Sequence, residues 1–385
     1  MSRIDDLVAE RAPKGVKSCA LDTVVKFRRG TSITKSAVTA GVVPVIAGGR
    51  SPAYFHSASN RTGETIAVAG SGAYAGFVSY WDIPVFVSDA FSVHPDVSLL
   101  LPKYVYYFLL AKQDVIHSTK TVGGVPHVKG ADIGFLRIPV PPLEIQHEIV
   151  RILDTFTELE AELEAELEAR KRQYAYYRDS LLSFPEAAGV RWATMGEICT
   201  KVTSGGTPSS GRTDYYGGDI PWLRTQEVDY TDITQTGMTI TEAGLKNSSA
   251  KWIPPNCVIV AMYGATAAKV AVNAIPLTTN QACCNLQVDP AQAEYRYVFH
   301  WVANEYECLK GLGEGSQSNL NAQKVKNYPI PVPSLEHQRE IVSILDNFDA
   351  LVNDLSIGLP AELNARRKQY EYYRDKLLTF DEAVS

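Results

Sequence analysis

The sequence predicts an α+β fold that is built twice: two strand-rich, mixed α/β domains separated by two long antiparallel helices, paired as a coiled coil with an internal pseudo-twofold repeat. Three observations predict it. The segment IPVPPLE at residues 138–144 returns as IPVPSLE at residues 330–336, half a chain length later. Long helical patterns follow both copies, and short β-branched runs bounded by Gly, Pro, Ser and Asn fill the rest. A period this long indicates a duplicated domain pair and not a solenoid.

Each strand-rich part contains buried strands and one helical stretch. The β-branched runs Thr65 to Ala69 and Cys257 to Ala261 predict strands. Amphipathic helices are expected around Pro102 to Ile116 and around Ala291 to Leu309. The glycine-rich segment that starts at Gly70 does not have the spacing of a dinucleotide-binding loop, so we interpret it as a turn between strands.

The two helical patterns, Leu143 to Leu182 and Leu335 to Leu378, would each form a rod of roughly 60 Å. The first contains three tandem ELEA tetrads, so that leucine recurs at every fourth residue. In the second, the same leucine spacing continues for one tetrad more. The second helix is therefore expected to be one turn longer, with a kink or local break at Gly358 and Pro360. The leucine stripes favour pairing of the two helices. A solvated single helix is the alternative for the ELEA run.

Charge is distributed unevenly along the chain. The net charge of −6 divides into +5 for residues 1–137, −6 for residues 138–189, −1 for residues 190–329 and −4 for residues 330–385. The acidic residues thus lie mainly in the helical segments, and the other segments are basic or nearly neutral, which permits phosphate binding there. No apolar run is long enough to span a bilayer, and the N-terminus does not resemble a secretory signal. The six cysteines show no C-x-x-C spacing, so we expect a reduced cytoplasmic protein without a structural metal site.

Motifs for catalysis are absent from the sequence. There is no G-x-x-x-x-G-K-[ST] loop, no H-E-x-x-H pair, and no Asp/Asn-Pro-Pro-aromatic tetrad of the kind that amino-methylating enzymes use to hold an extruded base. The segment Ile253-Pro254-Pro255-Asn256 inverts that order and is interpreted as a turn. We therefore expect a binding protein without catalytic residues, bound metal or cofactor of its own.

The repeated helix motif resembles that of the specificity subunit of type I restriction–modification systems. Both copies fit I-P-V-P-x-L-E-x-Q-x-E-I-V-x-I-L-D-x-F. In the second domain, Gly206-Thr207-Pro208, the segment YYGGDIPWL at residues 215–223 and Thr279-Asn280-Gln281 are typical of the target recognition domains of that family. The first domain lacks the Thr-Asn-Gln and Tyr-Tyr-Gly elements and has AGSGAYAG at residues 69–76 in the corresponding place. The resemblance covers essentially the whole chain.

The resemblance implies a division of labour along the chain. Residues 1–137 and 190–329 would be target recognition domains that each read one half of a split, asymmetric double-stranded DNA site. Residues 138–189 and 330–385 would be the conserved helices that set the gap between the halves and dock two methyltransferase (modification) subunits. Those partners would carry S-adenosylmethionine, and motor–nuclease (restriction) subunits would join for cleavage. One tetrad adds about 6 Å of helical rise, comparable to one or two base-pair steps, so ELEA units offer a way to change the gap.

Candidate DNA contacts are side chains in loop-like sequence that suit phosphates or base edges. In the first domain they are Arg28, Arg29, Lys35, Arg50, Asn60, Arg61, Tyr74 and Lys129, and in the second Thr207, Arg212, Tyr216, Arg224, Gln226, Tyr263, Thr266, Lys269, Gln317 and Asn319. The alternative for each is an exposed polar side chain or a structural cap. We expect Asn280 and Gln281 to have structural roles, because motif residues that recognition domains of different specificity share seldom determine which base is bound.

Two tyrosine–basic clusters recur on the helices, and their candidate docking residues are Arg170, Tyr174, Tyr177, Arg366, Tyr370 and Tyr373. Docking of partner subunits and packing of helix against domain are equally open for them. For the whole chain, a coiled-coil assembly scaffold that does not bind DNA is the alternative to a DNA reader. A self-sufficient methyltransferase is disfavoured by the missing catalytic motif.

Overall fold

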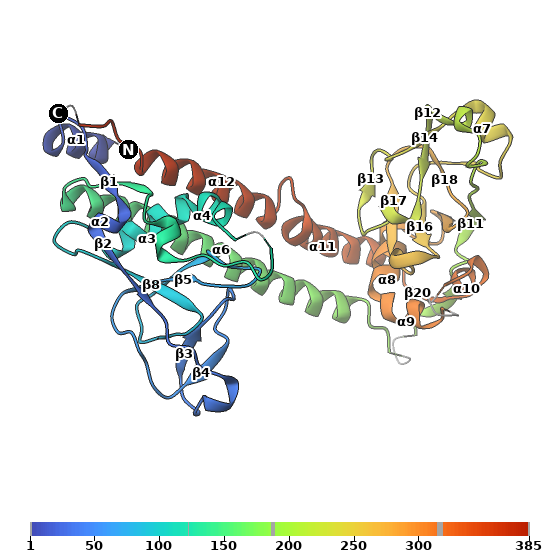
Figure 1. Cartoon of the computed structure of the whole chain (residues 1–385). Helices are drawn as coiled ribbons and strands as arrows, with labels where there is room; N and C mark the ends of the chain where they lie inside the picture. The colour runs from blue at the N-terminus through green and yellow to red at the C-terminus, as the bar shows by residue number, and fades with distance from the viewer. Residues whose placement is uncertain (1, 122, 186–188, 314–318, 384–385) are drawn as a thin grey trace. The chain divides into compact units, whose positions relative to one another are not determined.

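The structure is a computed structural model that describes residues 2–121, 123–185, 189–313 and 319–383; Figure 1 shows it as a ribbon. The chain forms two compact units. Unit 1 comprises Met1–Ala165 and Ala361–Ser385, and unit 2 comprises Glu166–Pro360. The domain boundaries drawn from the sequence stay predictions.

Unit 1 holds the first strand-rich domain. A four-stranded antiparallel sheet has the order β2-β8-β5-β6, a three-stranded sheet has the order β4-β3-β7, and β1 pairs with β9. The strands are β1 (Ser18–Ala20), β2 (Val25–Arg29), β3 (Val43–Ile46), β4 (Tyr54–His56), β5 (Thr65–Ala69), β6 (Val78–Trp81), β7 (Phe86–Val87), β8 (Ala90–Pro95) and β9 (Arg137–Pro139). The short helices are α1 (Ser2–Arg11), α2 (Leu21–Val24), η1 (Lys35–Ala37), α3 (Pro102–Ala111), α4 (Gln113–Ser118) and α5 (Gly130–Ile133).

Unit 2 repeats this topology with one more strand in each of the two larger sheets. Its sheets have the orders β11-β19-β16-β17-β13 and β14-β12-β18-β15, and β10 pairs with β20. The strands are β10 (Arg191–Thr194), β11 (Cys199–Ser204), β12 (Tyr216–Leu223), β13 (Asp232–Ile233), β14 (Thr239–Ile240), β15 (Trp252–Ile253), β16 (Val258–Ala261), β17 (Val270–Asn273), β18 (Leu277–Thr279), β19 (Cys283–Val288) and β20 (Pro329–Val332). The short helices are η3 (Thr213–Tyr215), η4 (Thr225–Glu227), α7 (Glu242–Lys246), η5 (Gly264–Thr266), α8 (Tyr295–Asn304), α9 (Tyr306–Gly311) and α10 (Ala322–Lys326).

The two sheets that carry the cores are built alike. All five residues of β5 and all four of β16 are buried, as the uninterrupted apolar runs predict. The helix that packs on each sheet is followed directly by a second one: α3 by α4, and α8 by α9. The helices expected around Pro102 to Ile116 and Ala291 to Leu309 are therefore confirmed, but each is two consecutive helices. In the first core, Tyr104 of α3 is fully buried and its hydroxyl donates to the Pro139 carbonyl, and in the second core Tyr297 of α8 bonds to Pro331 in the same way.

The predicted pairing of the long helices is present in both units. In unit 1, α6 (Leu143–Leu181) lies against α12 (Leu359–Leu377): Arg367 contacts Glu160 and Glu164, and Phe156 stacks on Tyr373 with ring centroids 5.6 Å apart. Residue numbers fall along α6 as they rise along α12, so the helices are antiparallel. The solvated single helix considered for the ELEA run is therefore wrong.

In unit 2, α6 lies against α11 (Leu335–Asn353) with the same geometry. Tyr177 stacks on Phe348 at 5.4 Å, and Phe184 meets the edge of His337 at 6.5 Å. Both contacts belong to an antiparallel pair, because residue numbers again run in opposite directions.

The prediction of a longer second helix is wrong, although the expected break is confirmed. α11 ends at Asn353 and α12 begins at Leu359, and each has 19 residues, whereas α6 has 39 without interruption. The extra residues form a turn because the Asp354 carboxylate accepts hydrogen bonds from the backbone N–H groups of Ser356 and Ile357. Leu355 is 81 % exposed, so the leucine stripe stops there.

The predicted turns are also confirmed. Gly70 to Phe77 connects β5 to its antiparallel neighbour β6, and Gly72 and Gly76 have positive φ angles of 83° and 85° that favour glycine. The segment Pro254 to Asn256 connects β15 to β16. Within the described part of the chain, no helix has the length and apolarity that crossing a membrane would require.

Candidate nucleic-acid interface

The loop after β5 and the segment between β3 and β4 together present an aromatic–basic pair at the surface of unit 1. The guanidinium of Arg50 lies 5.0 Å from the ring centroid of Tyr74, and Tyr74 is 46 % exposed. The start of the loop is held in place by the segment around Pro126 to Val128, because Gly72 N–H donates to the Pro126 carbonyl and Val128 N–H donates to the Gly70 carbonyl. The exposed Lys129 follows directly in the chain. A guanidinium stacked on an exposed ring suits contact with a phosphate or an unstacked base.

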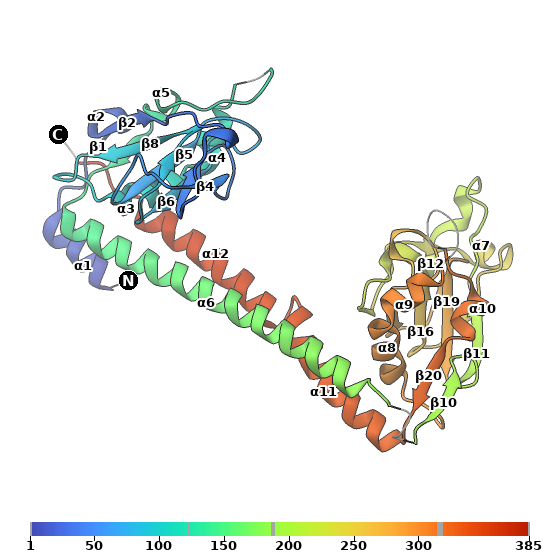
Figure 2. The ribbon, with the colours of Figure 1, turned by 90° about the horizontal axis from the view of Figure 1, so that it is seen from below.

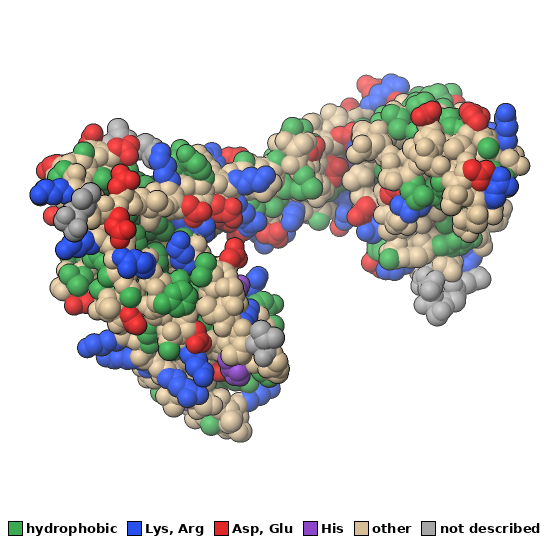
Figure 3. Space-filling model, turned by 45° about the horizontal axis from the view of Figure 1, so that its top comes forward, with side chains coloured by type: hydrophobic (Ala, Val, Ile, Leu, Met, Phe, Trp, Pro, Cys, Tyr) green, Lys and Arg blue, Asp and Glu red, His purple; other side chains and the backbone are tan. Residues whose placement is uncertain are grey.

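A second group of cations lies on the four-stranded sheet of unit 1. Arg28 and Arg29 of β2 are exposed, and His94 lies on the neighbouring strand β8 two residues from the partner of Arg28. Burial lowers the pKa of His94, and the charges of Arg28 and Arg61 lower it further. Burial and Arg28 likewise lower the pKa of Arg61. The smaller part of each shift comes from neighbouring positive charge, which a phosphate group would relieve. Figure 3 shows Lys and Arg side chains over the lower part of this domain, on the face that it presents.

Two candidate DNA-contact residues of unit 1 form hydrogen bonds within the domain. Asn60 donates to the carbonyl of Val87 at 2.8 Å and accepts from its N–H at 2.7 Å. Arg61 donates from Nε to Ser92 Oγ at 2.8 Å and from NH2 to the Arg29 carbonyl at 3.0 Å. These bonds tie the loop before β5 to neighbouring strands. Lys35 is an exposed residue of the short helix η1.

In unit 2 one group of candidates surrounds the loop between β16 and β17, the counterpart of the glycine-rich loop. Tyr263 directly precedes η5 and is 40 % exposed. Thr266 Oγ1 donates to the Thr225 carbonyl at 2.8 Å, next to Arg224 and Gln226. Leu320 N–H donates to Met262, as Val128 does to Gly70 in unit 1. Neighbouring Asn319 has a buried Oδ1 for which the described residues supply no hydrogen bond.

The charges in this group are partly neutralised. Lys269 Nζ lies 2.6 Å from Asp229 Oδ1, and Arg224 Nε lies 3.6 Å from Glu227 Oε1. This agrees with the nearly neutral charge of the second domain. Gln317, the remaining candidate here, lies outside the described residues.

The other group in unit 2 surrounds the Gly-Thr-Pro motif. A Cβ atom on Gly205 would lie 1.9 Å from the Thr279 carbonyl, so only glycine fits there. Next to it, the exposed Thr207 hydroxyl donates to the side chain of Gln281. Asn280 Oδ1 accepts from Ala282 N–H in the adjacent turn. Asn280 thus stabilises the turn, as expected, while Gln281 lies beside Thr207, a candidate DNA-contact residue.

Two further candidates near this motif have partners within the protein. Arg212 forms a bidentate ion pair with Asp214, with nitrogen–oxygen distances of 2.9 and 2.7 Å, which raises the pKa of the guanidinium. The Tyr216 hydroxyl donates to the Pro208 carbonyl at 2.6 Å. Arg212 remains exposed, so its ion pair could exchange for a phosphate, whereas Tyr216 is half-buried and supports the loop.

The four candidate tyrosines of the repeated basic clusters pack between the helices. Tyr174 and Tyr177 of α6 lie on Phe348, and Tyr370 and Tyr373 of α12 lie on Phe156. The two candidate arginines pair on their own helices: Arg170 with Glu166 at 2.7 Å, and Arg366 with Glu362 at 3.4 Å. Helix packing therefore accounts for most of the tyrosine surface, although Tyr177 is still 39 % exposed.

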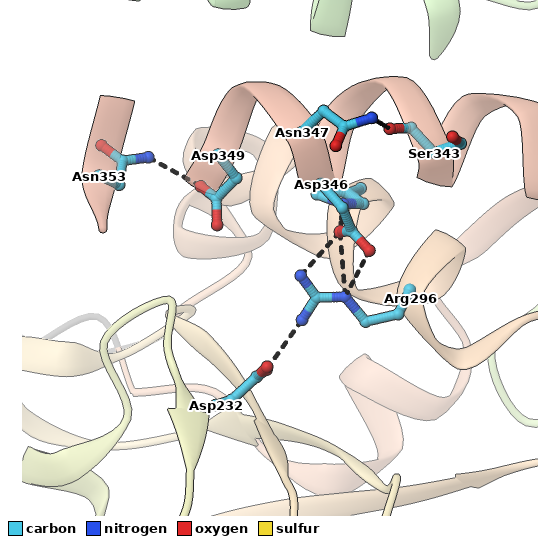
Figure 4. A network of polar contacts seen from close by, with 8 residues as sticks. Asp232, Arg296, Ser343, Asp346, Asn347, Asp349 and Asn353 are labelled. Atoms are coloured by element: carbon cyan, nitrogen blue, oxygen red, sulfur yellow. Dashed lines mark hydrogen bonds and ion pairs between the residues drawn. The ribbon is translucent and has the colours of Figure 1, made fainter. Parts of the chain in front are cut away.

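Sequence reasoning missed the residues that join each strand-rich domain to its helix. In unit 2, Asp346 of α11 accepts from Arg296 NH2 and is bonded to His300 Nε2, both at 2.7 Å, and Arg296 NH1 also contacts Asp232 at 2.8 Å (Figure 4). His300 is fully buried. Burial raises the pKa of Asp346, but the bonds from His300 and Arg296 outweigh it, so the pKa lies below its ordinary value.

Unit 1 has the same arrangement with different side chains. Asp154 of α6 accepts from Lys103 Nζ at 2.8 Å and from the Tyr107 hydroxyl at 2.5 Å. Both aspartates belong to the repeated I-L-D-x-F motif, so the signal was present in the sequence. No group of His, Cys, Asp or Glu side chains in the described ranges has the grouping of a metal site.

Comparison with known proteins decides the family. A model described as the type I restriction modification DNA specificity domain matches twice, at residues 13–169 and 190–365. The chain belongs to this family. An Escherichia coli relative, the type I restriction enzyme EcoR124I/EcoR124II specificity subunit, is 38 % identical over 300 residues that cover 74 % of this chain and 72 % of that protein. A putative type I specificity subunit of Mycoplasma pneumoniae is 30 % identical over 293 residues, covering 72 % of this chain and 82 % of the relative.

Solved structures of the same kind share the fold. The type I restriction–modification S subunit from M. genitalium has a TM-score of 0.66 at 18 % identity and covers 94 % of this chain and 96 % of its own. A chain from a study of complex assembly and conformational transition of the type I R-M system has a TM-score of 0.60 at 20 % identity, covering 95 % of this chain and 98 % of its own. The predicted α+β fold with an internal repeat and the family resemblance are thus confirmed.

Proposed function

We propose that this specificity protein reads a bipartite, asymmetric double-stranded DNA site, with one half bound by each strand-rich domain. The observation that carries the proposal is that the two strand-rich domains share one backbone framework but present different side chains at the corresponding surface loops. The sheets, the helices that pack on them and the aspartates that join the domains to the long helices correspond in the two units. The surfaces differ: the loop after β5 carries Tyr74, on which Arg50 from the segment between β3 and β4 stacks, where the loop after β16 carries Tyr263 and Thr266. Equal frames with different contact residues suit two readers of different sequences.

We further propose that the helices set the distance between half-sites and dock two methyltransferase subunits. Antiparallel helices with ion pairs such as Arg367 to Glu160 give a frame of fixed length. S-adenosylmethionine and the chemistry of methylation would then belong to the partner, and motor–nuclease subunits would add cleavage. This chain would supply sequence selection alone.

Selection from a random pool of double-stranded DNA tests the proposal. The chain, mixed with its methyltransferase subunit, should enrich one motif with two fixed blocks separated by unspecified bases. Measuring at two salt concentrations separates selection from phosphate attraction, because only the latter should weaken steeply for all sequences alike. Absence of any enriched motif with the partner present would favour the assembly scaffold. Methyl transfer by the purified chain alone would instead favour an autonomous enzyme.

A further inference from the structure

Two lysines outside the predicted set of DNA contacts lie beside the Gly-Thr-Pro motif of unit 2. Lys201 belongs to β11, which forms the edge of the five-stranded sheet next to β19 (Figure 2). The chain continues from β11 directly into the motif, which begins at Gly206. A Cβ atom on Gly206 would lie 2.4 Å from the backbone nitrogen of Ala250, so the segment before Lys251 packs against the motif. The two segments that carry the lysines therefore meet at the motif.

A small pocket is lined by both lysines. Its walls come from β11, from β19 and from the segment around β15, and its volume is about 70 Å³. Its residues with hydrogen-bond donors include Lys201, Thr203, Lys251 and Gln287, and none of the described residues that line it is acidic. The volume is roughly that of two water molecules, so the pocket can receive the two free oxygens of a phosphodiester and is too small for a base.

The charges of Lys201 and Lys251 are not neutralised within the protein. Both residues are exposed, and neither ammonium group forms an ion pair or a hydrogen bond with another residue in the described part of the chain. By contrast, the candidate cations Arg212, Arg224 and Lys269 each lie against a carboxylate. An anion can therefore bind the two lysines without displacing a carboxylate, whereas at the other three positions it must compete with one.

Unit 1 has positive charge at the same point of its sheet, but from different residues. By the strand pairing, Arg28 of β2 takes the place of Thr203, and Arg61 takes the place of Ile253. Arg61 donates from NH2 to the Arg28 carbonyl at 3.4 Å and from Nε to Ser92 Oγ at 2.8 Å. In unit 1 a guanidinium thus occupies the place that is a pocket in unit 2. Positive charge at equivalent points of both domains suits a contact that both make with the same chemical group.

We propose that the pocket formed by Lys201, Thr203, Lys251 and Gln287 binds one backbone phosphate of the DNA beside the second half-site. The inference rests on the proposed function, because it requires that unit 2 binds DNA. The two ammonium groups neutralise the phosphate, and the hydroxyl and the side-chain amide donate to its free oxygens. Since the phosphate is the same at every base, this contact sets the position of the domain on the duplex and does not select a sequence.

Fluorescence anisotropy tests the proposal with the full chain, its methyltransferase subunit and a duplex that carries the enriched motif. The double variant Lys201→Ala/Lys251→Ala should weaken binding about tenfold, on this duplex and on an unrelated one alike, and should lower the slope of log affinity against log salt concentration by about 1. Lys310→Ala is the matched control. It removes an exposed lysine of α9, which packs on the opposite side of the sheet, and should bind as the wild type does.

Uncharged methylphosphonates, placed one at a time along the duplex, locate the phosphate. The wild type should lose affinity when the substitution lies at one position beside the second half-site. The double variant should be insensitive to the same substitution, because the charge that it would meet is already gone. Both lysines are exposed, so the melting temperature of the variant should equal that of the wild type.

The outcomes separate the inference from the proposed function. If the wild type selects a bipartite motif and the double variant binds it with the same affinity and salt dependence, the inference fails while the proposed function stands. If the wild type selects no DNA with its partner present, both fail. Altered bases in the second half-site would show that the lysines read bases, and an equal loss in Lys310→Ala would show that only overall charge matters; either result overturns the proposal.

Discussion

Replacing Asp346 with asparagine should destabilise unit 2 selectively. The change keeps the shape of the side chain but removes the charge that faces Arg296 and His300 at 2.7 Å. Breaking a buried ion pair costs about 3–5 kcal/mol and losing an exposed one about 0.5 kcal/mol. The Asp346 side chain is 35 % exposed and that of Arg296 is 17 % exposed. We therefore expect a loss of about 2 kcal/mol, which lowers the melting temperature by about 4–8 °C for a unit of this size.

Tryptophan fluorescence reports this change in the right place, because Trp192, Trp222, Trp252 and Trp301 all lie in unit 2 and only Trp81 lies in unit 1. Asp154→Asn, the twin substitution in unit 1, should leave the main fluorescence transition in place. The pH dependence has a definite sign. Because the folded-state pKa of Asp346 lies below its ordinary value of 3.8, its contribution is present at neutral pH and is lost as the pH falls through the folded-state pKa. Equal shifts of the fluorescence transition for both variants, or a loss below about 0.5 kcal/mol for Asp346→Asn, would contradict the stabilising role of the contacts between Asp346, Arg296 and His300.

Three further predictions concern DNA reading and the frame. Arg50→Ala and Tyr74→Ala should each weaken binding to the first half-site about tenfold in fluorescence anisotropy, and unchanged affinity would exclude the stacked pair as a contact. Deleting Glu162 to Ala165 should shorten α6 by about 6 Å and reduce the gap between half-sites by one or two base pairs, with the same bases in each half; altered bases would contradict the role of the helices in spacing. Asn60→Ala should destabilise unit 1 by about 2 kcal/mol in calorimetry, since it leaves the Val87 N–H without its partner and removes one of the two donors to the Val87 carbonyl; a neutral effect would show that water replaces the amide.

Some features could be predicted from the sequence because they are encoded locally. The strand Thr65 to Ala69 is a short β-branched and apolar run, and the break near Gly358 and Pro360 is marked by residues that end helices. The turn that replaces an added helical turn could not be predicted, since it depends on the Asp354 carboxylate competing for backbone N–H groups. A leucine tetrad alone does not determine whether these residues form a non-helical turn or one more turn of helix.

The candidate site was only partly predictable. Arg50 and Tyr74 are far apart in the chain and come together through the fold. Asn60 and Arg61 look like DNA contacts in the sequence but bond to neighbouring strands. Their residue types alone indicate that such side chains are polar and able to contact DNA. Whether they face solvent or a backbone group depends on strand pairing, which local patterns do not determine.

The account's central claim is that each strand-rich domain reads its own half of the DNA site. Long-read methylome sequencing tests this most directly, in a host that expresses the chain and its methyltransferase subunit. The wild type should give one bipartite methylated motif. Exchanging residues 1–137 for the corresponding domain of a relative should change the bases of one half and leave the other half and the gap unaltered. A motif in which both halves change together, or a single uninterrupted motif, would contradict the claim.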